Sequence, residues 1–195
     1  MENKELSAPG RLAGAGIEKC LGRLSRAYSG AWRLLGVSVF PGSMADAVGR
    51  HDFKDGAAAV HVNVQSAQPF LTVLLFGSGD VGHIAKCFLA EPFSEAREIA
   101  QFEDVMLLEI GNMILNALIN SLLNAIKQSA VPSVPGLLKG DARSILGGLG
   151  GMIDTAAGAR VIVADISIEL DGRTCRGEVA AVIPEELAAR MESAA

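Results

Sequence analysis

Apolar residues recur at helical spacing in several stretches of the chain. The longest and most regular pattern covers residues 102–128, and its wide apolar face is made of Met106, Leu107, Ile110, Ile114, Leu118, Leu122 and Ala125. A weaker amphipathic pattern covers residues 11–32, where several glycines lower the helix propensity. Shorter helices are expected at residues 82–90, 95–99, 141–156 and 184–191.

Other stretches have the β-branched and aromatic content that is typical of strands. They cover residues 34–40, 57–65, 69–76, 160–170 and 174–183. The joint at residues 66–69 and the Asp171-Gly172 pair have the composition of tight turns. The second to fifth of these stretches are therefore expected to form two hairpins.

The order of these elements repeats along the chain. Placing Pro41-Gly42 on Pro135-Gly136 sets an offset of 94 residues, which aligns Leu21 with Leu115, Leu24 with Leu118 and Val37 with Val131. Each half then has a helix, a short strand, a hairpin and a helix, and two such halves can close each other's open strand edges. We predict one α+β domain at residues 11–195 after a polar tail at residues 1–10. Its pseudo-symmetric half-repeats, at about residues 11–100 and 101–195, would share a six-stranded, largely antiparallel sheet with long helices packed on one face.

Composition narrows the function classes. The chain has 195 residues, 50% of them hydrophobic, and a formal net charge of −5 without a run of Lys or Arg, which argues against nucleic-acid binding. The longest unbroken aliphatic run is far shorter than a bilayer requires, and the N-terminus has no export signal, so we expect no membrane association and a cytoplasmic location. The three cysteines form no C-x-x-C pair, and the three histidines share no ligand spacing, so no disulfide framework and no metal site are expected.

A glycine-rich motif follows the strand at residues 69–76. Gly77, Gly79 and Gly82 match the G-x-G-x-x-G pattern of dinucleotide-binding proteins. That pattern works inside a βαβ unit, where a second parallel strand supplies an acidic residue for the ribose. Residues 83–128 are instead predicted to be helical, so we interpret the glycines as a strand-to-helix turn that needs unusual backbone angles.

The predicted helix at residues 102–128 also carries a polar stripe. Glu109, Asn112, Asn116 and Asn120 follow the spacing i, i+3, i+7 and i+11, which places them on one side of a helix. Asparagine costs up to about 0.7 kcal/mol relative to alanine at an interior helix position, whereas a merely solvated face would use Glu, Lys or Gln. The stripe therefore indicates a functional surface. The alternative, in which these asparagines hydrogen-bond neighbouring backbone or pack against polar groups in a crowded helix pair, stays open.

The residues around the start of this stripe resemble a known sequence signature. Glu109-Ile110-Gly111-Asn112 is followed, after 22 intervening residues, by Pro135, and this arrangement resembles the E-x-x-N…P signature of the CheC, CheX and FliY family of chemotaxis response-regulator phosphatases. The likeness extends over about residues 11–190 in the order of helices and strands. Pro135 would be a structural part of the motif.

The resemblance implies a mechanism. The family removes the aspartyl phosphate of CheY-type response regulators, so Asn112 would orient the attacking water and Glu109 would pair with the regulator's lysine. Asn116 and Asn120 would belong to the partner-binding surface. No cofactor is expected on this chain, because the Mg²⁺ would be bound by the regulator. A CheD-like protein is a further candidate partner, and the chain is expected to be a monomer or a homodimer.

The sequence departs from the family pattern in two respects. Family members commonly carry Ser or Asp four residues before the glutamate, where this chain has Val105, and the nearby Asp104 is expected to cap or precede the helix. Under the repeat, Glu109 and Asn112 align with Ala15 and Glu18, which predicts a single active face.

Two other functions compete with this interpretation. One is a non-catalytic adaptor or flagellar-switch module that binds a response regulator without hydrolysing its phosphate. The other is nucleotide binding at residues 77–82, which a thermal shift with NAD or NADP would reveal.

Overall fold

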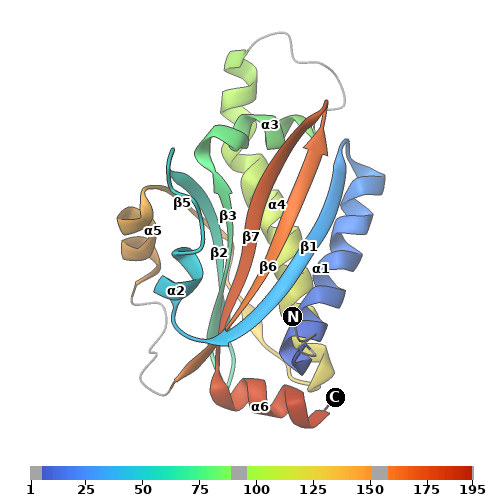
Figure 1. Cartoon of the computed structure of the whole chain (residues 1–195), viewed down its shortest axis with the longest axis vertical. Coiled ribbons are helices and arrows are strands. Elements are labelled where there is room, and N and C mark those ends of the chain that lie inside the picture. The colour runs from blue at the N-terminus through green and yellow to red at the C-terminus, as the bar shows by residue number, and fades with distance from the viewer. Residues whose placement is uncertain (1–5, 89–95, 151–157, 195) are drawn as a thin grey trace, which may run out of the picture.

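The computed structural model describes residues 6–88, 96–150 and 158–194. One antiparallel sheet forms the centre of the molecule, with helices on both of its faces (Figure 1). In chain order the elements are α1 (Ala8–Ala27), β1 (Ala31–Pro41), α2 (Met44–Val48), β2 (Ala57–Gln65), β3 (Phe70–Gly77), α3 (Val81–Lys86), α4 (Ala96–Ala125), β4 (Val131–Pro132), β5 (Gly136–Gly140), α5 (Ala142–Leu149), β6 (Ala159–Leu170), β7 (Arg173–Pro184) and α6 (Glu185–Ala194).

The two halves of the chain are interleaved in the sheet. Its order is β1-β6-β7-β3-β2-β4, with β5 also paired to β2, and all pairings are antiparallel. The hairpins β2-β3 and β6-β7 meet at the centre, where β3 pairs with β7. Each half lends its first strand to the other half's hairpin, since β1 pairs with β6 while β4 and β5 pair with β2. The α+β class and the antiparallel sheet are confirmed.

The strand ladders correct two details of the predicted repeat. Two short strands, β4 and β5, together occupy the place of the expected sixth strand, so the described residues form a seven-stranded sheet. Pro41 lies opposite Arg160 near the start of β6, and Gly140 lies opposite Ala57 at the start of β2. In the folded halves, Pro41 therefore corresponds to Gly140. The 94-residue offset had instead aligned Pro41 with Pro135.

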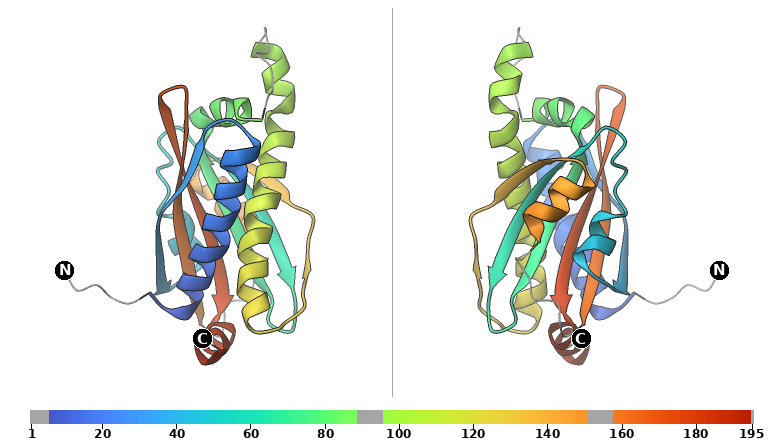
Figure 2. Two further views of the ribbon diagram at one scale, coloured as in Figure 1. Left: turned by 90° about the vertical axis from the view of Figure 1, so that its right-hand side faces the viewer. Right: turned by 90° about the vertical axis from the view of Figure 1, so that its left-hand side faces the viewer.

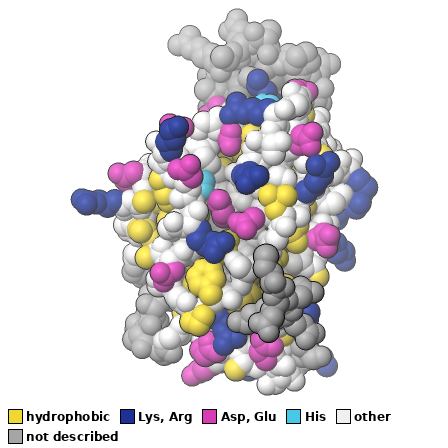
Figure 3. Space-filling view, viewed as in Figure 1, with side chains coloured by type: hydrophobic (Ala, Val, Ile, Leu, Met, Phe, Trp, Pro, Cys, Tyr) yellow, Lys and Arg dark blue, Asp and Glu magenta, His cyan; other side chains and the backbone are white. Residues whose placement is uncertain are grey.

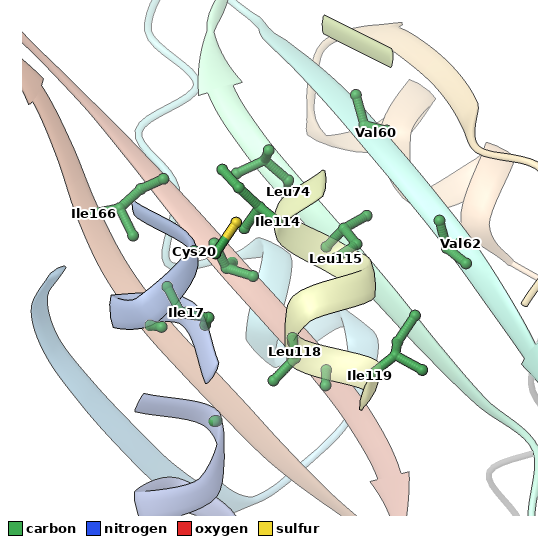
Figure 4. Close-up of a cluster of buried hydrophobic side chains, with 14 of the residues drawn as sticks. Ile17, Cys20, Val60, Val62, Leu74, Ile114, Leu115, Leu118, Ile119 and Ile166 are labelled. Atoms are coloured by element: carbon green, nitrogen blue, oxygen red, sulfur yellow. The ribbon is translucent and has the colours of Figure 1, made fainter. Parts of the chain in front are cut away.

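The two long helices, α1 and α4, lie side by side on one face of the sheet (Figure 2). Their buried side chains interlock with those of the strands beneath, as Figure 4 shows for Ile17, Ile114, Leu118, Val60 and Ile166. The Ser121 hydroxyl on α4 donates a hydrogen bond of 2.6 Å to the Leu12 carbonyl on α1. The predicted packing of the long helices on one face is thus observed, and α6 contributes Leu187 and Met191 to the same core.

The short helices α2 and α5 cover part of the opposite face of the sheet (Figure 1). Their Val48, Ile145 and Leu149 pack on the alternate residues of the central strands, which form a second buried cluster. Both helices begin with a side-chain cap, because Ser43 accepts from the Asp46 amide and Asp141 accepts from the Ser144 amide.

Several predicted boundaries are wrong. The first helix starts at Ala8 and ends at Ala27, and β1 begins at Ala31, so the end of the predicted helix at residues 11–32 is a strand. Gly30 makes this change of direction at φ +90°, a conformation that favours glycine. The separate helices expected at 95–99 and 102–128 are one helix, α4, which ends at Ala125. The predicted ends at residues 89–90 and 151–156 lie outside the described residues.

The glycine-rich motif is a turn, as predicted, but not for the predicted reason. The chain leaves β3, makes a short 3-10 turn at Ser78–Asp80 and enters α3. None of the motif glycines has a positive φ, and Gly77 has φ −59°. Arg173 instead secures the turn, donating to the Gly79 carbonyl at 3.0 Å and to the Asp80 carboxylate at 2.6 Å. Since β3 is antiparallel to both neighbours, no βαβ unit surrounds the motif.

The segment Phe102–Ala125 of α4 is long and apolar enough to cross a membrane by length and composition, contrary to the expectation from aliphatic runs. In the fold, its apolar side chains at Leu107, Ile114 and Leu122 are buried in the main core. A helix packed in the core of a folded domain has the same length and apolar composition.

Candidate functional site

Glu109 and Asn112 lie on the side of α4 that faces away from the sheet. Glu109 is exposed and Asn112 is half-buried, whereas their neighbours Ile110 and Gly111 are buried. Three residues apart on a helix, the two side chains start about 5–6 Å from each other. No described residue forms a hydrogen bond or ion pair with the Glu109 carboxylate that would occupy it. A carboxylate and a carboxamide are thus presented together to solvent.

Gly111 explains how this part of α4 sits so close to the sheet. A Cβ at this position would lie 2.3 Å from Cγ1 and 2.6 Å from Cβ of Val60, a buried residue of β2. Only glycine lets the helix approach β2 this closely. The contact fixes the rotation of α4, and this rotation turns Glu109 and Asn112 outward.

Asn116 holds the Asn112 side chain. Its Nδ2 donates a hydrogen bond of 2.7 Å to Oδ1 of Asn112, one helical turn away. This bond joins two side chains of the same helix, so it is neither the bond to neighbouring backbone nor the contact across a helix pair that the alternative described. The bond leaves Asn112 with its two N–H donors and one acceptor lone pair of Oδ1 for other groups. A role of Asn116 in binding a partner stays a prediction.

Asn120 and Asn124 continue the polar stripe, and both are exposed. They line a cavity between α1 and α4 rather than the surroundings of Asn112. The structure thus separates Asn120 from the rest of the predicted stripe, because Asn120 lines this cavity together with Asn124.

Apolar side chains extend the outward face of α4 toward its N-terminus. Val105 is one turn before Glu109 and 55% exposed, at the position where the family pattern has Ser or Asp. The prediction that Asp104 caps or precedes the helix is wrong, because α4 begins at Ala96. Asp104 instead forms a salt bridge with Lys139 of β5 and ties the helix to the edge of the sheet. No local pattern indicates this pair, because 35 residues separate its members.

Pro135 lies in the loop between β4 and β5, the two short strands that pair with β2 at one edge of the sheet. Ser133 attaches this loop to β2, since its amide donates to the Asn63 carbonyl at 2.8 Å and its Oγ accepts from the Asn63 amide at 3.1 Å. Val134 is left 86% exposed. After Pro135, Gly136 lies against the ring of His61, where a Cβ would be 2.4 Å from Nε2. Burial lowers the pKa of His61, which favours its neutral form.

The arrangement suits chemistry that is done on a group brought by another molecule. A carboxylate can pair with a cation, and a carboxamide can orient a water, but neither is a strong nucleophile. In the part of the chain that the structure describes, no group of three or more His, Cys, Asp or Glu side chains could hold a metal ion.

Solved structures resemble this fold, although the sequence matches no family model and no curated protein. FliY from Thermotoga maritima has a TM-score of 0.62 at 15% identity, over 95% of this chain and 92% of that one. The FliM middle domain from H. pylori has a TM-score of 0.59 at 11% identity, over 100% of both chains. CheX from Borrelia burgdorferi, in a complex with CheY, BeF3 and Mg²⁺, has a TM-score of 0.56 at 13% identity, over 89% of this chain and 96% of that one. The chain therefore has the CheC/CheX/FliY-type fold.

Proposed function

We propose that this protein is a phosphatase that hydrolyses the aspartyl phosphate of a CheY-type response regulator in the cytoplasm. The observation that carries the proposal is the pairing of an exposed Glu109 with Asn112 on one face of a helix, on a fold shared with CheX and FliY. No cofactor on this chain is required, because the regulator supplies the phosphorylated aspartate and its Mg²⁺.

Positioning is the main contribution that these residues can make. Phosphoryl transfer passes through a loose transition state, so placing a water in line with the phosphorus accelerates it without a nucleophile from this chain. The Oδ1 of Asn112 keeps one lone pair for that water, and its amide protons can donate to phosphoryl oxygens. The carboxylate of Glu109 would pair with the regulator's lysine. Asn116 would act as a positioning residue, because it restrains the carboxamide of Asn112.

Exposed apolar groups beside the pair give a partner further area to contact. Val105 extends the outward face of α4. A valine where the family pattern has Ser or Asp removes one polar contact with the regulator. We therefore expect docking here to depend more on apolar contact and on Glu109 than it does in relatives with the polar residue.

The test measures phosphate lifetime on purified response regulators charged with acetyl phosphate. Asn112→Ala is expected to lower the maximal rate by about 100-fold, because the water loses its orienting group. Glu109→Gln is expected to raise the regulator concentration for half-maximal rate. Glu186→Gln on α6 is the matched control, since Glu186 is exposed and this change alters the net charge equally. Full activity of Asn112→Ala would refute the assignment.

A non-catalytic binding module is the second candidate, and the similarity to a FliM middle domain favours it. In that case the protein would bind the phosphorylated regulator through α4 and leave the phosphate lifetime unchanged. Binding and hydrolysis measured on the same samples separate the two functions. A CheD-like partner would be sought in the same binding assay, and light scattering would decide between monomer and homodimer.

A further inference from the structure

The contact between α1 and α4 leaves a groove open to solvent, beyond the Glu109 and Asn112 pair. The cavity has a volume of about 550 Å³, and we call it the α1–α4 groove. It is lined by Leu12, Ala15, Gly16, Lys19, Arg23, Ala117, Asn120, Ser121, Asn124 and Ala125. Figure 2 shows the two helices side by side on one face of the sheet.

The groove is shallow because the two helices touch at its floor. A Cβ on Gly16 would lie 2.5 Å from Cβ of Ser121 and 2.9 Å from the Ala117 carbonyl oxygen, so α1 packs directly on α4. Small side chains such as Ala15 and Ala117 line the rest. Along the helix axis, the part of α1 from Leu12 to Arg23 is about 16 Å long, which corresponds to three helical turns.

The charged side chains among the described lining residues are all basic. Lys19 and Arg23 stand one turn apart on α1, both are exposed, and neither forms an ion pair with a described carboxylate. The α4 wall offers the carboxamides of Asn120 and Asn124, and no charged residue occurs in the sequence between Glu109 and Lys127. The face with α2 and α5 instead mixes Lys and Arg with Asp and Glu (Figure 3). The chain as a whole is acidic, with a net charge of −5, so the basic groove differs in sign from the rest of the protein.

We infer that the α1–α4 groove binds an acidic amphipathic helix of a partner protein. The apolar floor fits a seam of small side chains, and Lys19 and Arg23 fit glutamates or aspartates on the flank of that helix. The carboxamides can bond to either polar flank. None of the described residues that line the groove is aromatic, so they offer no stacking platform for nucleic-acid bases. This inference concerns binding and does not depend on phosphatase activity.

The experiment uses the whole protein and defined peptides of about 15 residues, long enough to form a helix over the groove. A fluorescein-labelled peptide with an alanine seam and glutamate flanks is titrated, and its twin carries glutamine in place of glutamate. The glutamate peptide is expected to bind at least about tenfold more tightly than the glutamine peptide at low salt, and the difference should shrink as salt is added.

Two double variants locate the site. Lys19→Glu/Arg23→Glu is expected to weaken the glutamate peptide by about tenfold or more and to bind a lysine-flanked peptide instead. Arg11→Glu/Arg26→Glu changes the net charge equally on the same helix, outside the groove, and should keep the wild-type affinity within about threefold. Circular dichroism melting confirms that both variants are folded.

Clear outcomes would overturn the inference. Equal losses of affinity for the glutamate peptide in the two double variants would mean that α1 attracts the peptide by its overall positive charge. Equal affinity for the glutamate and glutamine peptides would mean that the groove does not recognise the negative charges. Displacement of the peptide by pyrophosphate or by an oligothymidine at lower concentration than the unlabelled glutamate peptide would reassign the groove to a phosphate-bearing ligand. If the glutamate peptide does not bind, the inference that the groove binds an acidic helix is rejected.

Discussion

Gly111→Ala tests whether the closeness of α4 to the sheet positions the site. The added methyl would lie 2.3, 2.6 and 3.0 Å from Cγ1, Cβ and Cγ2 of Val60. Ordinary van der Waals contact begins at 3.4 Å, so the nearest atom is about an ångström too close. Val60 cannot turn away, because it is 1% exposed and its β-branched side chain has few allowed rotamers. The helix must therefore move off the strand.

The expected cost combines two opposing effects. Overpacking a core by one methyl costs about 1–3 kcal/mol, and this site has three short contacts, so we take the upper end. Alanine is a better helix former than glycine by about 1 kcal/mol, which offsets part of this cost. The net loss of unfolding free energy is about 2 kcal/mol, or a melting temperature lower by about 4–8 °C for a domain of this size.

Urea unfolding followed by circular dichroism measures this loss. Gly147→Ala is the matched control, because Gly147 lies within α5 and a Cβ there meets nothing within 4 Å, so this variant should gain up to about 1 kcal/mol. Val60→Ala should relieve the clash, and the double variant Gly111→Ala/Val60→Ala should be more stable than the sum of the single effects by about 1 kcal/mol or more. Equal stabilisation by Gly111→Ala and Gly147→Ala would refute the close-contact argument.

Three further expectations follow from single contacts. Asn116→Ala should lower the phosphatase rate by about tenfold with little change in the half-saturating regulator concentration, because a freed carboxamide is less well oriented; equal kinetics would leave Asn116 without a positioning role. Ser121→Ala should cost about 1 kcal/mol of unfolding free energy in urea, since the Leu12 carbonyl loses its donor. Hydrogen bonds at the helix caps lower the pKa of Asp46 and Asp141, so the urea midpoint should fall as pH drops below about 4, and Asp46→Asn/Asp141→Asn should flatten that fall.

Local patterns were sufficient to predict most of the sheet. The strand at residues 57–65 is found with the expected bounds, and the Asp171-Gly172 turn joins β6 and β7 with both residues at positive φ. Boundaries failed where two patterns overlap. Residues 28–35 continue the helical spacing of apolar residues from α1, yet they also suit a strand. The left-handed Gly30 decides between them, and glycine alone does not reveal its φ in a sequence.

The site shows the same division between local and long-range information. Helical spacing was enough to place Glu109 and Asn112 on one face, but the hydrogen bond between the side chains of Asn116 and Asn112 was not predicted. The salt bridge of Asp104 with Lys139 depends on the path of the edge strand, so no local pattern contains it. The α1–α4 groove depends on a helix pair that only the folded chain brings together.

Two close contacts determine which side of α4 the solvent meets. Gly111 presses α4 onto Val60 of the sheet, and Gly16 lets α1 pack on Ser121. With the sheet and α1 both held at contact distance, α4 cannot rotate without a clash, so its remaining side is fixed outward. The Glu109, Asn112 and Asn116 side chains occupy that side. The helix propensity lost at the asparagines is then the cost of a rigid polar surface on a helix whose other sides are committed to the core.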